Sequence, residues 1–111
     1  MPTPRPPLGE FEVVVLLAAL QLGDKVVGTG IRDEIEARSG RSVARGAVYV
    51  TLDRLEAKGL LASRLDGAPP ERGGHPRRYF RVTQAGLSQL RYSLSALDRM
   101  RAGLEPLLGK P

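Results

Sequence analysis

The chain has 111 residues, enough for one domain with a modest core, and its 41% hydrophobic and 26% charged residues argue against wholesale disorder. A formal net charge of +5 favours an anionic partner, either nucleic acid or a membrane surface. The absence of cysteine excludes disulfides and thiolate metal sites and is compatible with a reducing cytoplasm, where we expect the protein to act.

The N-terminal region predicts an extended arm followed by a buried helix. Residues 1–7 include four prolines and should form the arm, while residues 8–22 should form the helix. Its apolar run at residues 13–20 is preceded by Glu10 and Glu12, where an export signal carries positive charge, and is too short to span a bilayer. We therefore expect neither a signal peptide nor membrane insertion. The predicted inward residues are Phe11, Val14, Val15, Ala18, Leu20 and Leu22.

A second helix is predicted at about residues 30–39. Ile31 and Ile35 are four positions apart and share one face, and Gly40 is suited to end the helix.

The third helix, at about residues 44–58, has the clearest pattern. Val48, Leu52 and Leu55 repeat with helical spacing and should face the core, and Gly59 follows as a stop. Its start is a weak point, since Ala44 stands where a capping side chain is usual, which forfeits about 1 kcal/mol.

Two short antiparallel strands are predicted at residues 60–65 and 78–82. Their connection, residues 66–76, is rich in glycine and proline and longer than a tight hairpin loop, so it should project from the domain. Thr83 is then a suitable N-cap for a last helix of about residues 84–104.

The last helix carries a leucine seam. Its leucines alternate by three and four positions, which is typical of a helix laid along another helix. Because the upstream elements already form a compact unit, a homodimer interface is favoured; the alternative is that the leucines fold back onto the first helix. Gly103 and Pro106 suggest a bend near the end. The seam comprises Leu87, Leu90, Leu94, Leu97 and Leu104, with Leu108 in register.

Catalysis is not indicated. The single histidine, His75, lies in the projecting loop without an orienting carboxylate, and neither a phosphate-binding loop nor a cluster with metal-ligand spacing is present. We expect a protein that is not an enzyme and has no cofactor and no metal.

A helix beside a basic hairpin is the outline of a winged helix-turn-helix, which binds DNA. The third helix would be about 20 Å long and fits a major groove. Arg45 is the best candidate for a base contact, and Gly46 would let the backbone approach. Tyr49 is either a DNA contact or a partly buried aromatic residue. The weaker phosphate candidates are Thr51 and Arg54, of which Arg54 has the alternative of pairing with acids on its own helix.

The loop between the strands would form the wing. Its guanidinium groups suit phosphate oxygens or a minor groove, and its glycines allow close approach. The alternative is a solvated charged loop. The candidate wing residues are Arg72, Gly73, Gly74, His75, Arg77 and Arg78.

Four segments resemble the PadR-like family of bacterial transcriptional regulators. They read L-G-E-F-E-V-V-V-L-L-A-A-L at residues 8–20, G-x-x-I-x-x-E-I at 28–35, G-A-V-Y-V-T-L-D-R-L-E-A-K-G-L-L at 46–61 and E-R-G-G-H-P-R-R-Y-F-R-V-T-Q-A-G at 71–86. Nearly the whole of residues 8–90 is covered. The short C-terminal segment, a single helix, is similar to the smaller branch of the family.

The resemblance implies a homodimeric winged helix-turn-helix, usually a repressor, that binds a palindromic operator. Residues 44–58 would enter the major groove and residues 66–77 would touch the flanking backbone or minor groove. The fold class expected is mainly α with a two-stranded antiparallel wing. The domains expected are a flexible arm at 1–7, a DNA-binding domain at 8–82 and a dimerisation helix at 83–111.

Two departures from the family pattern are Ala44, in place of a capping Ser or Thr, and Val27, in place of an aromatic residue. Some small-branch relatives bind flat aromatic drugs through tryptophan at the dimer interface, and this chain has no tryptophan, so that property is not carried over. A repressor sensing a small hydrophobic effector among Phe11, Val15 and Leu97 remains an alternative. A winged-helix module that binds a protein partner is another.

Overall fold

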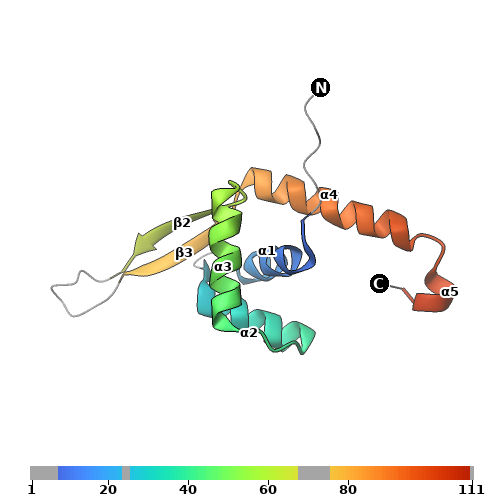
Figure 1. Cartoon of the computed structure of the whole chain (residues 1–111), viewed down its shortest axis with the longest axis horizontal. Helices are drawn as coiled ribbons and strands as arrows, with labels where there is room; N and C mark the ends of the chain where they lie inside the picture. The colour runs from blue at the N-terminus through green and yellow to red at the C-terminus, as the bar shows by residue number, and fades with distance from the viewer. Residues whose placement is uncertain (1–7, 24–25, 68–75, 111) are drawn as a thin grey trace, which may run out of the picture.

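The computed structural model describes residues 8–23, 26–67 and 76–110 (Figure 1). The predicted arm at residues 1–7 lies outside these ranges. The chain forms α1 (Glu10–Leu22), β1 (Val26–Val27), α2 (Gly28–Ser39), α3 (Arg45–Ala57), β2 (Leu61–Asp66), β3 (Arg77–Val82), α4 (Gln84–Arg101) and α5 (Glu105–Leu108). The predicted class, mainly helical with a small antiparallel sheet, is confirmed.

The sheet has three strands in the order β1-β3-β2, all antiparallel. β2 and β3 pair along their whole length, from Leu61 opposite Val82 to Asp66 opposite Arg77. The prediction of two strands was wrong in number, because β1 adds to the other edge of β3. Two residues are too few to show an alternating pattern, so only the pairing reveals this strand.

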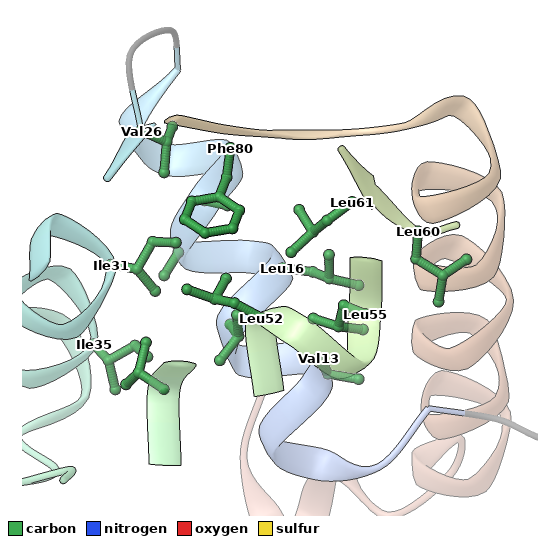
Figure 2. Close-up of a cluster of buried hydrophobic side chains, with 14 of the residues drawn as sticks. Val13, Leu16, Val26, Ile31, Ile35, Leu52, Leu55, Leu60, Leu61 and Phe80 are labelled. Carbon is green, nitrogen blue, oxygen red and sulfur yellow. The ribbon is translucent and has the colours of Figure 1, made fainter. Parts of the chain in front are cut away.

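The core lies between the helices and one face of the sheet (Figure 2). The predicted stripes are confirmed: Ile31 and Ile35 of α2 and Val48, Leu52 and Leu55 of α3 are all buried. α1 crosses behind α3 in Figure 1 and packs against α2, α3 and β3. The two helices of the helix-turn-helix are therefore held from behind by α1.

The inward face of α1 differs in part from the prediction. Val13 and Leu16 are buried, whereas Leu20, predicted to face inward, is 42% exposed. Residues 13–20 are all apolar, so the periodicity alone cannot select the buried side of this helix. Of the other predicted inward residues, Val15 and Ala18 are buried and Phe11, Val14 and Leu22 pack at the edge of the core.

The helix ends agree largely with the sequence. Gly40 ends α2 with a positive φ of 69°, and Ala44 stands before α3 without a side-chain cap. Thr83 caps α4, since its hydroxyl oxygen accepts a hydrogen bond from Gly86 N at 3.0 Å. α4 ends at Arg101, and Gly103, with φ of 85°, leads into α5. The C-terminal segment, predicted as one helix, thus contains two.

Candidate nucleic-acid interface

α3 presents one side to the core and the opposite side to solvent. Arg45, Gly46 and Arg54 are exposed on it. The Arg45 guanidinium lies 5.7 Å from the centroid of the Tyr49 ring, a distance typical of a cation–π contact. A Cβ built on Gly46 would meet no atom within 4 Å, so the backbone is open at this point. The first turn of α3 therefore offers an arginine and an accessible backbone to a ligand.

Tyr49 lies at the junction of α2 and α3. Its ring packs against Gly28, the first residue of α2, and its side chain is partly buried. Tyr49, Gly28, Thr29, Pro76 and Arg77 line one hollow, together with Val27 and Arg78. A helix start presents unpaired N–H groups and a partial positive charge, so this hollow gathers hydrogen-bond donors suited to an anion.

Gly28 and Thr29 were missed as candidate residues from the sequence. The run G-T-G at residues 28–30 was a usable signal, because small residues at a helix start let another group approach the backbone. The sequence alone does not reveal that Tyr49 lies beside the start of α2.

Thr51 must be removed from the predicted phosphate contacts. Its side chain is 5% exposed and lies on the buried side of α3 with Leu52 and Leu55.

Arg77 and Arg78 were predicted as equivalent wing contacts, and the structure separates them. Neighbouring side chains of a strand leave opposite faces of the sheet. Arg77 is exposed, whereas Arg78 donates hydrogen bonds to Asp53 at 2.8 Å, to Glu56, and to Ser63 Oγ at 3.3 Å. Arg78 is thus engaged within the protein.

This network shifts the ionisation of its members. Burial alone would lower the pKa of Arg78, but its hydrogen bonds to Asp53 and Glu56 raise it overall. The hydrogen bonds that Glu56 accepts from the Ser63 hydroxyl, at 2.6 Å, and from Arg78 lower the pKa of the carboxyl group. Both shifts favour the charged forms, so Glu56 and Arg78 remain ionised at neutral pH.

The remaining predicted wing residues, Arg72, Gly73, Gly74 and His75, lie outside the described residues. The outer face of the hairpin carries two further arginines that the sequence reasoning did not single out. Arg64 lies with its guanidinium 5.3 Å from the Tyr79 ring centroid, and Arg81 is exposed. Their alternation with the inner residues of β2 and β3 was the available signal.

The predicted leucine seam is divided. Leu90 is 3% exposed and belongs to the core of its own protomer, so its predicted place in a dimer interface is wrong. Leu94 packs against that core and Leu87 is partly buried. Leu97, by contrast, is 55% exposed, and Leu104 is exposed as well. The alternative of folding back onto the first helix thus holds for the proximal half of α4.

A hydrogen bond fixes this folded-back half. Ser93, buried on α4, accepts a hydrogen bond from Leu8 N at 3.0 Å, which joins α4 to the start of α1. Beyond this point the distal half of α4 extends away from the other helices (Figure 1).

Two other kinds of site have no support in residues 8–23, 26–67 and 76–110. No group of histidine and carboxylate side chains there is arranged to hold a metal ion. No helix in the same ranges has the length and apolar character to cross a bilayer.

Comparisons with known proteins agree with this architecture. The model of the Transcriptional regulator PadR-like family matches residues 16–92. The transcriptional regulator Rv3488 of Mycobacterium tuberculosis is 36% identical over 77 residues, which cover 69% of this chain and 67% of that protein.

Two solved structures illustrate the likeness in three dimensions. A PadR family regulator from Eggerthella lenta is 29% identical with a TM-score of 0.68, covering 92% of this chain and 88% of that one. PadR from Bacillus subtilis, solved in complex with operator DNA, is 18% identical with a TM-score of 0.63 and covers 77% of this chain and 47% of that one.

The family consists of regulators, which agrees with the expectation that the chain is not an enzyme. Its model covers more than half of the sequence and includes α2, α3, the hairpin and the proximal half of α4. The chain belongs to the PadR-like family of transcriptional regulators.

Proposed function

We propose that this PadR-like protein is a homodimeric repressor that binds a palindromic operator in the cytoplasm. The observation that carries the proposal is the exposed first turn of α3, where Arg45 stands beside the open backbone of Gly46. A helix whose N-terminal residues reach base edges is the usual reading element of a helix-turn-helix. Arg45 would contact a base, preferably guanine.

Phosphate contacts would flank this reading element. The hollow between the start of α2, Tyr49 and Arg77 would receive one backbone phosphate of the DNA. Arg54, exposed on α3, and the wing residues 66–77 would contribute further electrostatic attraction. Bacillus subtilis PadR, which shares the fold and was solved in complex with operator DNA, supports DNA as the partner.

Dimerisation would be the task of residues 83–111, with residues 8–82 forming the reading head. The distal half of α4 and α5 expose a group of large apolar side chains, which favours an interface with another chain. A second copy is the natural partner, because a symmetric pair of heads explains a palindromic site. Their half-sites should lie about 34 Å apart. The exposed residues are Leu97, Met100, Leu104, Leu107 and Leu108.

Repression would follow from occupancy of the promoter, since bound protein excludes RNA polymerase. We do not extend the proposal to a small hydrophobic effector. Val15, one of the three residues considered for such a site, is fully buried in the core. Phe11 packs at the edge of that core, whereas Leu97 is exposed on α4.

Selection of binding sites from random duplex DNA would test the proposal. We expect a palindromic consensus, protected in footprinting over two half-sites, and preferred to scrambled DNA at about 150 mM salt, where non-specific binding is weak. Arg45→Ala should weaken binding to the selected site by about 1–3 kcal/mol and relax one position of the consensus. Arg91→Ala, which removes the same charge from the exposed side of α4, serves as the matched control and should retain the consensus. Equal affinity of the wild type for selected and scrambled DNA would refute specific operator binding.

A further inference from the structure

Arg78 joins the hairpin to the recognition helix. It leaves β3 on the inner face of the sheet, the face that also carries Ser63 of β2, because alternate residues of a strand share a face. From there its guanidinium reaches Asp53 Oδ1 at 2.8 Å and Glu56 Oε1, both on α3. One side chain therefore makes contacts to two positions on α3 separated by about one helical turn.

Contacts with Ser63 and Phe80 also fix the position of this guanidinium. Its Nε donates to Ser63 Oγ at 3.3 Å, and Ser63 in turn donates to Glu56. Its Cζ lies 4.7 Å from the centroid of the buried Phe80 ring. An arginine has five N–H donors in a rigid plane, and three of them are used here.

The charge of the cluster argues against a phosphate contact. Arg78 contributes one positive charge, and Asp53 and Glu56 contribute two negative charges, which leaves a net charge of −1 (+1 − 2). A phosphate approaching this cluster meets two carboxylates that already compensate the arginine. Arg77, the neighbour of Arg78, is exposed, so its guanidinium is accessible to a phosphate.

We propose that Arg78 is a positioning residue for operator recognition: it fixes the angle of the β2–β3 wing relative to α3, so that wing and helix reach the same stretch of DNA together. This inference rests on the proposed operator binding. The rigid fork is essential to the role, because the single ammonium group of lysine has no planar arrangement of donors with which to hold two carboxylates and a hydroxyl at once.

The test compares the affinity of variants for the selected operator and for scrambled DNA over a range of salt concentrations. Arg78→Lys keeps the positive charge, and we expect it to weaken operator binding about tenfold, the size of a coupling between residues in one network. The slope of log affinity against log salt should stay unchanged, because no phosphate contact is lost. Arg77→Ala should instead reduce that slope by about 0.9.

Glu56→Gln separates the positioning role from simple electrostatics. Removing a negative charge near DNA strengthens binding if charge alone matters, whereas the loss of the bridge should weaken operator binding several-fold while leaving affinity for scrambled DNA unchanged or higher. Glu34→Gln on α2, whose carboxylate pairs with Arg38 within that helix, is the matched control and should leave operator affinity within a factor of about two.

A distance measurement tests the same role without DNA. The chain has no cysteine, so spin labels at Val50→Cys on α3 and Leu65→Cys on β2, both exposed positions, report the relation of wing to helix. We expect a narrow distance distribution in the labelled parent protein and a broad one when Arg78→Lys is added. An unchanged distribution overturns the inference, as does tighter operator binding by Glu56→Gln.

Three further outcomes have distinct meanings. If Arg78→Ala lowers the salt slope by about one while Arg78→Lys restores full affinity, Arg78 is a phosphate ligand and the positioning role is wrong. If the wild type shows no preference for any selected DNA, the proposed function and this inference fail together. If the wild type prefers the selected DNA and Arg78→Lys and Glu56→Gln weaken operator binding without a change in salt slope, the proposed function is intact and the inference is supported.

Discussion

A Cβ atom on Gly28 would lie 2.5 Å from Cζ of Tyr49, so the first residue of α2 and the tyrosine ring on α3 share a space that only glycine leaves open. This close approach brings the start of α2 against α3 at the side where DNA is proposed to bind. It also explains why Tyr49 is partly buried and still lines a surface hollow.

Gly28→Ala should therefore impair operator binding more than folding. The atoms in conflict are the tip of the tyrosine ring, which can rotate outward, so we expect a loss of about 1 kcal/mol in the free energy of unfolding and a clear loss of operator affinity. Urea unfolding and DNA titration measure the two effects. The double variant Gly28→Ala/Tyr49→Ala should bind no worse than Tyr49→Ala alone; additive losses would show that the two residues act independently.

Gly86→Ala should be destabilising for a different reason. A Cβ at this position would lie 2.2 Å from the backbone oxygen of Leu60, and a backbone atom cannot move aside as a side chain does. We expect a loss of about 2–3 kcal/mol in the free energy of unfolding, measured by urea denaturation at fixed protein concentration.

Gly46→Ala is the matched comparison for this glycine, since it makes the same chemical change in a helix. With no atom within 4 Å of the new Cβ, it should stabilise α3 by about 0.5–1 kcal/mol. The same methyl group should weaken operator binding, because it keeps the backbone from approaching DNA. Lower stability of Gly46→Ala, or unchanged stability of Gly86→Ala, would contradict the described packing.

Acid should destabilise the fold through Glu12. Burial favours the neutral form of this carboxyl group, but the hydrogen bonds from Lys58, at 2.8 Å, and from Gly9 N prevail and lower its pKa below the ordinary value of 4.5. A lowered folded-state pKa contributes stability that is present above pH 4.5 and is lost as the pH falls through the folded-state value.

Glu12→Gln removes this contribution and should flatten the acid limb of a plot of stability against pH. The urea midpoint measured between pH 7 and pH 3 checks it. Some acid sensitivity should persist, because the pKa of Glu56 is lowered as well. Parallel curves for the wild type and the variant would show that the Lys58 contact has no energetic weight.

The two halves of α4 should respond differently to the same substitution. Leu90→Ala opens a cavity in the core and should reduce the free energy of unfolding by about 2–4 kcal/mol. Leu97→Ala should leave the fold of the protomer intact and weaken self-association, measured by sedimentation over a range of concentrations. Unchanged association of Leu97→Ala would place the dimer interface elsewhere.

Helical positions were predictable where polar and apolar residues alternate with a clear period. In α3 the stripe of Val48, Leu52 and Leu55 selected the buried side correctly. In α1 every residue from 13 to 20 is apolar, so a pattern with no polar side misplaced Leu20. The limit there is physical: a helix with apolar residues on every side carries no periodic signal, whichever side is buried.

Long-range pairing accounts for most of the other differences. β1 exists because Val26 lies opposite Phe80, far along the chain, and no local pattern of two residues reveals it. Arg78 differs from Arg77 because Asp53 and Glu56 stand across from it on α3. Leu90 was assigned to a dimer because its spacing suits any helix partner, whether α1 of the same chain or another protomer. In each case the type of residue is visible in the sequence, but its partner is decided by contacts with residues far away in the chain.

The continuity of α4 has a consequence for the spacing of operators. Its 18 residues span about 27 Å. The helix is joined to the start of α1 at Ser93, and its side chain at Leu97 is exposed. One residue inserted between these points would swing the distal half by about 100° and advance it by about 1.5 Å, whereas four would nearly restore its phase and add about 6 Å. In the proposed dimer, a small insertion in this one helix would therefore change the half-site spacing that the two copies span, while the proposed DNA-binding surface of α3 stays the same.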